Sequence, residues 1–273
     1  MGVSDSGPVP PAPGELNYGS YLELDRILES QHPRSAPAEH DEMLFIVIHQ
    51  AYELWFKQIL HEFDKVERDL SSNDLYGAIH TFKRLRTIVK VLVEQMDILE
   101  TMTPMSFTSF RDRLDTSSGF QSVQYRIFEF RLGYKREPMM RYFDESHHGH
   151  DRLVAAWEGR TIGDHFLEFL RQRGVRIPAE LLDRDLQQPF PANESVQRGL
   201  LHLYRSEPSV AILLELMTDF DEGVQEWRYR HVKLVERTIG QKKGTGGSMG
   251  VEFLKKSLFL PAFPDLWAMR HEL

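Results

Sequence analysis

The segment DEMLFIVIHQAYELWFKQILHEFDKVERDL, residues 41–70, decides the fold class. Apolar residues recur in it at spacings of three and four, which places them on one face of an α-helix. The members of this apolar stripe are Phe45, Ile48, Tyr52, Trp55, Ile59, Phe63, Val66 and Leu70. The segment therefore predicts one long helix that buries this face against neighbouring helices.

Three other segments carry the same period. We expect a second helix over about 74–100, ended by Thr103-Pro104, and a third over 120–130. A fourth is expected over 208–239, where Gly240 offers a C-cap. Strand signals are nearly absent, because no stretch alternates apolar and polar residues between turn residues. The predicted fold class is all-α, with a core of long packed helices.

Composition changes along the chain suggest its domain organisation. Residues 1–14 contain four prolines and three glycines, which predicts a disordered N-terminal lead. Residues 15–273 read as a single helical domain. Within it, residues 135–191 are less regular and are divided by glycine and proline, so we interpret them as a small inserted helical region.

Charge and cysteine content exclude several classes of function. The chain has 273 residues, a formal net charge of −8 and no cysteine, so thiol nucleophiles, disulfides and cysteine-ligated clusters are excluded. An acidic chain is a poor candidate for binding nucleic acid. Its longest wholly apolar run, residues 43–48, is far shorter than the roughly 20 residues of a membrane span. We expect a cytoplasmic protein without nucleic-acid or membrane partners.

Two of the twelve histidines lie on apolar stripes. His49 shares a helix face with Phe45 and Tyr52, and His231 continues a row that includes Val224 and Trp227. One such histidine is usually a hydrogen-bonded core residue. Two of them, each on a long helix rich in aromatic residues, favour an enclosed planar cofactor, and haem fits this pattern. The spacing does not say which histidine would bind iron.

Two further motifs have competing interpretations. The tract around His147, His148 and His150 resembles a metal site but has no matching second half, so a solvated loop is the better interpretation. The glycine-rich segment 240–250 follows a helix instead of a strand and lacks the spacing of a phosphate-binding loop. It is either a flexible linker or a mobile lid over a ligand, with Thr245 as its polar contact.

Phe107 and Arg111 are four residues apart and face the same way if their segment is helical. An aromatic ring beside a guanidinium suits an amino-acid substrate, since the ring packs on an apolar side chain while the guanidinium holds the carboxylate. The alternative is a surface arginine paired with Asp112 or Asp115.

Taken together, seven segments in order along the chain resemble the tryptophan 2,3-dioxygenase family, in its short bacterial form. They are LNYGSYL (16–22), DEMLFIVIHQAYELWFK (41–57), LETMTP (99–104), FR (110–111), SSGFQS (117–122), WRYRHV (227–232) and GTGGS (244–248). The resemblance implies an all-helical haem b enzyme that oxidises L-tryptophan with O2 to N-formyl-L-kynurenine, the first step of the kynurenine pathway. It also implies a homotetramer built as a dimer of dimers.

The resemblance also assigns roles to individual residues. His231 corresponds to the proximal haem ligand, and His49 to the distal histidine that accepts the indole N–H. Arg111 corresponds to the residue that binds the substrate carboxylate. The remaining matches are Phe45 and Phe107 around the indole ring, Thr245 at the ammonium group, Ser118 near haem and substrate, and Tyr18, Tyr21 and Leu22 in a segment that closes the neighbouring subunit's pocket. Some relatives have tyrosine where this chain has Phe107.

Two other functions remain open at the level of sequence. The first is a haem protein that acts on other indoles or inserts only one oxygen atom. The second is a helical interaction scaffold whose histidines belong to the core. The number of oxygen atoms in the product distinguishes the first from a dioxygenase, and the absence of a chromophore would identify the second.

Overall fold

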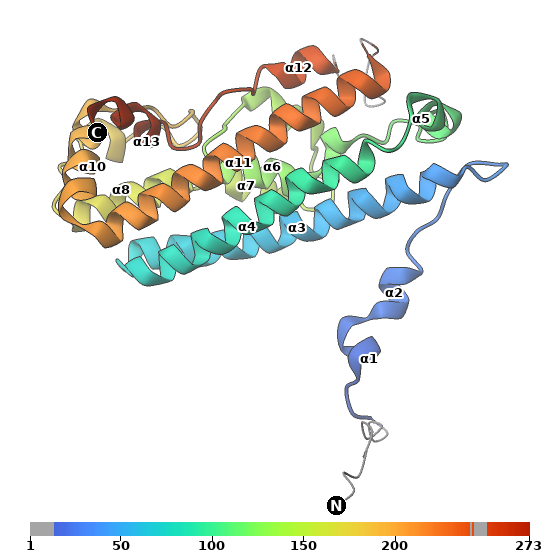
Figure 1. Cartoon of the computed structure of the whole chain (residues 1–273), viewed down its shortest axis with the longest axis horizontal. Helices are drawn as coiled ribbons and strands as arrows, with labels where there is room; N and C mark the ends of the chain where they lie inside the picture. The colour runs from blue at the N-terminus through green and yellow to red at the C-terminus, as the bar shows by residue number, and fades with distance from the viewer. Residues whose placement is uncertain (1–13, 241, 243–249) are drawn as a thin grey trace, which may run out of the picture.

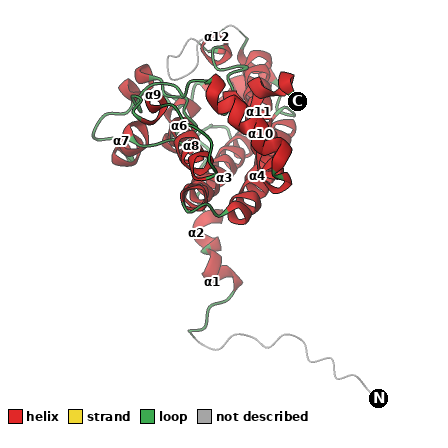
Figure 2. Ribbon diagram, turned by 90° about the vertical axis from the view of Figure 1, so that its left-hand side faces the viewer, coloured by secondary structure: helices red, strands yellow, loops and turns green. Residues whose placement is uncertain are grey.

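The structure is a computed structural model that describes residues 14–240, 242 and 250–273, and in this part of the chain all regular elements are helical (Figures 1 and 2). The predicted all-α class is confirmed. The elements are α1 Tyr18–Leu22, α2 Leu24–Leu28, α3 His40–Ser71, α4 Leu75–Leu99, α5 Pro104–Arg111, η1 Gly119–Gln121, α6 Val123–Arg131, η2 Glu137–Tyr142, α7 His150–Glu158, α8 Ile162–Gln172, α9 Ala179–Leu182, α10 Glu194–Ser206, α11 Pro208–Ile239, α12 Val251–Lys255, α13 Pro264–Ala268 and η3 Met269–Glu272.

The long helices α3, α4 and α11 lie side by side and form the body of the molecule (Figure 1). Phe63 of α3, Phe82 of α4 and Phe220 of α11 are fully buried where the three helices meet. The ring of Phe220 lies edge-on to the other two, with centroids 6.1 Å from Phe63 and 6.0 Å from Phe82. The apolar stripes are therefore buried between neighbouring helices as predicted, and burial of such rings drives the packing of these helices.

Two predicted boundaries were wrong in detail. Thr103-Pro104 does not end the second helix, because α4 ends at Leu99 and this pair begins α5. The Thr103 side chain accepts the backbone N–H of Ser106, and Pro104 occupies the first turn, where its missing N–H costs nothing. The predicted helix over 120–130 is divided into η1 and α6, because Ser122 interrupts it and caps α6.

The C-terminal segment is attached to α11 by a buried carboxylate. Asp221 accepts the backbone N–H groups of Ala262 (2.9 Å) and Phe263 (3.1 Å) and the indole N–H of Trp267 (2.9 Å). Burial raises the pKa of Asp221, although these donors oppose the shift. The contacts hold α13 against α11 and so fix the end of the chain.

The irregular middle contains η2 and the short helices α7 to α9. Here α8 packs on α3 and α7 packs on α6. Asp164 and Arg184 form a buried ion pair with an N–O distance of 2.7 Å, which ties the loop after α9 to the first turn of α8. His147, His148 and His150 lie in the turn before α7 and at its start, and no described residues cluster as a metal site. The domain boundaries and the inserted region remain predictions.

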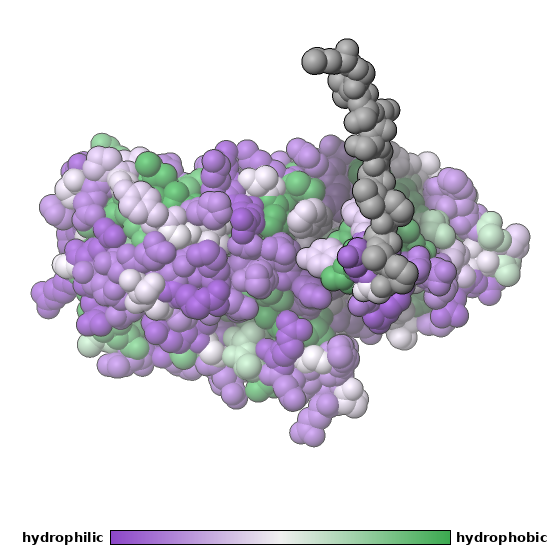
Figure 3. Space-filling model, turned by 90° about the horizontal axis from the view of Figure 1, so that it is seen from below, coloured by the Kyte–Doolittle hydropathy of each residue, from purple (hydrophilic) through white to green (hydrophobic). Residues whose placement is uncertain are grey.

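The first two helices extend away from the body as an arm (Figures 1 and 2). On this arm Tyr18 and Tyr21 are 76% and 73% exposed. The face drawn in Figure 3 is mostly hydrophilic with scattered hydrophobic patches. None of the described helices combines the length and the apolar character needed to cross a bilayer.

Candidate active site

A cavity of about 280 Å³ opens between α3, α4, α5, the η1–α6 segment and α11. One water molecule needs roughly 10–15 Å³ of such space, so the cavity has room for a large organic group. Six of the residues selected from the sequence line it: Phe45, His49, Phe107, Arg111, Ser118 and His231. The structure thus brings together residues that lie more than 180 positions apart in the chain.

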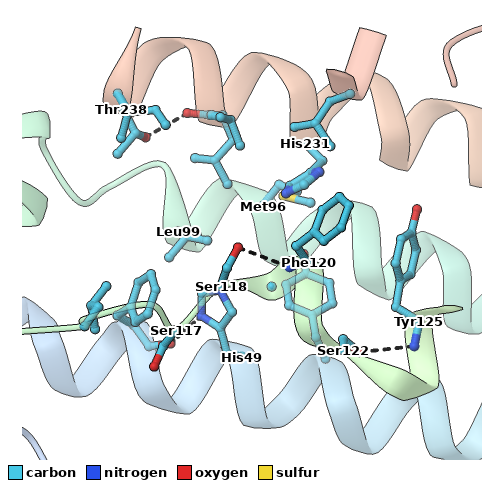
Figure 4. A pocket seen from close by; sticks show the side chains of 18 of the residues that line it. His49, Met96, Leu99, Ser117, Ser118, Phe120, Ser122, Tyr125, His231 and Thr238 are labelled. Carbon is cyan, nitrogen blue, oxygen red and sulfur yellow. Dashed lines mark hydrogen bonds between the residues drawn. The ribbon is translucent and has the colours of Figure 1, made fainter. Parts of the chain in front are cut away.

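His49 projects from α3 into the cavity (Figure 4). Its Nδ1 lies 2.7 Å from the backbone oxygen of Phe45. A carbonyl oxygen can only accept, so Nδ1 carries the hydrogen and Nε2 is left with a lone pair. Burial lowers the pKa of His49, although this hydrogen bond and the nearby Glu53 oppose the shift. The His49 imidazole is therefore neutral at pH 7, with Nε2 as an acceptor.

His231 projects from α11 toward the same space (Figure 4). Its ring stacks on the indole of Trp227, one turn earlier, at a centroid distance of 5.4 Å and an interplanar angle of 8°. Burial lowers the pKa of His231 to about 4, and the charge of Arg126 and a proton on His49 would act in the same direction. The neutral imidazole that results is the form that ligates a metal.

One end of the cavity is aromatic. The rings of Phe45 on α3 and of Phe107 and Phe110 on α5 form a triangle with centroid distances of 5.5 to 5.7 Å. Arg111 lies one turn after Phe107 on α5 and also lines the cavity. The helical geometry that the four-residue spacing required is present, so a flat apolar group and a carboxylate could be bound side by side.

Ser118 closes another part of the wall. Its side-chain oxygen accepts the backbone N–H of Phe120 at 3.3 Å and caps η1 (Figure 4).

Thr245 lies outside the described residues. Ile239, which precedes the glycine-rich segment, and Gly250, its last residue, both line the cavity. Tyr18, Tyr21 and Leu22 lie on α1 and are not among the residues that line the cavity of their own chain.

Several wall residues were missed by sequence reasoning. Met96 and Leu99 of α4 complete the floor between the two histidines (Figure 4), and Tyr52 anchors α3 to α4 by donating its hydroxyl hydrogen to the Leu92 oxygen at 2.7 Å. Arg126 of α6 also lines the cavity. Its signal in the sequence was a charged residue three positions after Val123 and one before Ile127, on an otherwise apolar face.

Comparison with known proteins places the chain in a family. Residues 10–155 and 193–273 match the family described as tryptophan 2,3-dioxygenase. The chain belongs to the tryptophan 2,3-dioxygenase family. The gap in this match, residues 156–192, overlaps the region that we interpreted as inserted.

Individual relatives of this name cover nearly the whole chain. The tryptophan 2,3-dioxygenase of Herpetosiphon aurantiacus is 50% identical over 94% of this chain and 98% of the relative. The one from Anaeromyxobacter sp. (strain K) is 49% identical over 94% and 96% of the two chains. The one from Bacillus cereus is 40% identical over 94% and 93%. The resemblance seen in the sequence is confirmed.

The cavity fits the haem that this family uses. Two neutral imidazoles enter it from α3 and α11, and the walls between them are largely aliphatic and aromatic. The chain contains no cysteine, so a thiolate axial ligand is excluded and imidazole is the available donor. Two arginines, Arg111 and Arg126, also line the cavity and can pair with carboxylates.

Proposed function

We propose that this cavity is where the chain, as a member of the tryptophan 2,3-dioxygenase family, oxidises L-tryptophan with O2 to N-formyl-L-kynurenine. The observation that supports it best is the pair of neutral imidazoles, His49 and His231, that face one cavity from α3 and α11. This reaction cleaves the indole C2–C3 bond and places both oxygen atoms in the product. It begins tryptophan catabolism by the kynurenine pathway.

In this proposal His231 holds the haem iron. Its ring is half-buried and neutral, and among the described residues none forms a hydrogen bond to either of its nitrogens. Trp227 fixes the plane of the ring by stacking instead. When bound, the haem b supplies the activation of O2 for attack on the indole. Ser118 lines the same cavity and would lie near both the haem and the substrate.

The substrate would occupy the aromatic end of the cavity. Phe45 and Phe107 pack on the indole ring, and Arg111 binds the carboxylate through two parallel N–H bonds. Thr245, in the glycine-rich segment, would contact the ammonium group. These contacts hold the amino acid at three points, which selects the L-enantiomer and excludes indoles without the polar groups.

His49 orients the reacting ring. Its Nε2 has a lone pair because Nδ1 donates to Phe45, so it can accept the indole N–H of the substrate. An imidazolium could not do so, and burial keeps the ring neutral. His49 therefore aligns the C2–C3 bond within the cavity and holds the indole proton at a defined atom.

The test uses the purified full-length chain. We expect one haem per chain, a Soret band that changes on addition of L-tryptophan, and two labelled oxygen atoms in the product under ¹⁸O2. A single labelled atom would indicate a monooxygenase. A colourless protein that does not respond to tryptophan would refute the proposal and favour the alternative of a helical interaction scaffold.

We also propose a homotetramer, a dimer of dimers located in the cytoplasm, in which the arm of one chain completes the neighbouring cavity. Tyr18 and Tyr21 are exposed on α1, and Leu22 follows them at 37% exposure. Apolar residues that are exposed close together on one short helix are typical of an interaction surface. Met43, Val47 and Leu54 are also exposed, on α3. Mass measurement in solution tests the assembly, and replacing Tyr21 by glutamate should weaken it.

A further inference from the structure

A buried group of charges lies against the cavity on the α6 side. It centres on Glu129, whose side chain is 2% exposed. Three arginines surround it: Arg126 donates to Oε2, Arg136 donates to Oε1 at 3.0 Å, and Arg228 lies 3.7 Å from Oε1. Burial alone would raise the pKa of Glu129, but the three guanidinium groups lower it below its usual value. The carboxylate is therefore ionised.

The group carries more positive than negative charge. One further carboxylate, Asp221, interacts electrostatically with Arg228. Even when it is ionised, three guanidinium groups face two carboxylates. Arg136 is 28% exposed at its side chain and is partly solvated, whereas Arg126 and Arg228 are 4% and 2% exposed. A buried positive charge is costly unless an anion compensates it.

Arg126 is the member of this group that reaches the cavity. Its Nε is buried and has no hydrogen-bond acceptor among the described residues, and its guanidinium packs over the ring of Phe120 at 4.8 Å. Among the described lining residues, only Glu53 has a carboxylate, and its Oε2 accepts the Gln124 side-chain N–H at 2.8 Å. Arg126 is thus a lining residue with a buried donor for which the described part of the chain offers no acceptor.

We propose that Arg126 binds a carboxylate of the cofactor, one of the two haem propionates. This inference rests on the proposed haem site. Arg126 acts electrostatically on His231, the proposed iron ligand, whereas Arg111 lies with Phe107 at the aromatic end. The two arginines of the cavity wall would therefore bind different anions. Arg111 would bind the substrate carboxylate, and Arg126 would bind a carboxylate of the cofactor. Glu129 positions Arg126 by pairing with Nη1.

The test compares haem with haem dimethyl ester, in which both carboxylates are masked. Dissociation constants are measured by Soret absorbance on the full-length chain after removal of haem. The wild type should bind haem more tightly than the ester. Arg126→Gln should weaken haem binding by roughly 10- to 100-fold, with little change for the ester, so that the preference is largely lost. Arg126→Lys keeps the charge and should keep part of the preference.

Arg136→Gln is the matched control, because Arg136 also pairs with Glu129 but does not line the cavity. It should leave the preference for haem over its ester unchanged. An equal loss for haem and ester in Arg126→Gln would show a merely structural role, and an unchanged preference would also overturn the inference. If Arg126→Gln does not fold, Arg126→Met, which also removes the charge, takes its place, and an unchanged preference for haem over the ester in that variant overturns the inference. A wild type that binds neither ligand refutes the proposed function itself.

Discussion

The two walls of the cavity hold their histidines by different means. On α3, a hydrogen bond from Nδ1 to the Phe45 oxygen commits one nitrogen of His49 and leaves the other as an acceptor. On α11, a parallel stack on Trp227 fixes the plane of His231 and uses neither nitrogen. A hydrogen bond chooses a tautomer, whereas a stack chooses only an orientation. The first arrangement suits substrate recognition and the second suits ligation of a metal.

The largest expected effect comes from removing His231, the proposed iron ligand on the α11 wall. His231→Ala should reduce bound haem from one per chain to nearly none, because no other described residue of that wall carries an imidazole. Absorbance and iron content measure this. Added imidazole should restore part of the Soret band by occupying the space left by the side chain. His202→Ala, at an exposed position of α10, is the control and should keep its haem. Full haem loading in His231→Ala would remove His231 from this role.

Replacing Arg111, on α5, should weaken binding of the substrate without changing binding of the haem. Arg111→Ala would remove the proposed charge-assisted bidentate contact to the substrate carboxylate, worth about 2–3 kcal/mol, so KM for L-tryptophan should rise roughly 30- to 150-fold. The haem content should stay the same. Arg113→Ala, an exposed position two residues later, should change neither quantity. A KM that stays at the wild-type value in Arg111→Ala would show that the carboxylate binds elsewhere.

Much of this arrangement was predictable from periodicity. The apolar stripes place α3 and α11 to within one or two residues of their observed ends, and they single out His49 and His231 as polar residues on buried faces. The spacing of Phe107 and Arg111 gives their common direction on α5. Periodicity is a local property, so it succeeds where a single helix determines the answer.

Contacts between segments were not predictable in this way. In the sequence Arg126 is a single charge on a short predicted helix. Only the packed structure shows that it belongs to a group with Glu129, Arg136 and Arg228. The tautomer of His49 likewise depends on a distance of 2.7 Å that no spacing reports. The start of α5 was missed because Thr103-Pro104 serves equally well after one helix and before another.

A smaller effect is expected when the stack itself is disturbed. Trp227→Leu removes the aromatic face that fixes the plane of His231, so haem affinity should fall by roughly tenfold, as for other partners that orient a metal ligand. Trp227→Phe keeps a ring and should lose less. Haem dissociation constants measure both variants. If the two variants bind haem equally well, stacking does not position His231.

The smallest effect is the pH dependence of kcat/KM that protonation of His49, on α3, should cause. Burial lowers the pKa of His49 below its ordinary value of 6.5. In the proposed role only neutral His49 can accept the indole N–H. We therefore expect kcat/KM to keep more than half of its plateau at pH 6.5 and to fall only at lower pH, by about tenfold per unit below the pKa. An unperturbed histidine would already be half protonated at pH 6.5.

The direction of the pKa shift of His49 follows from the groups around its imidazole ring. Glu53 and the Phe45 carbonyl stabilise the imidazolium and act to raise the pKa of His49, but desolvation outweighs both. Glu53→Gln should therefore move the acid limb to still lower pH, because it removes a negative charge without changing the side-chain length. His49→Ala should abolish this limb together with most of the activity. A wild-type midpoint at or above pH 6.5 would show that burial does not control the proton on His49, and the distinction between the two walls would then rest on the hydrogen bond alone.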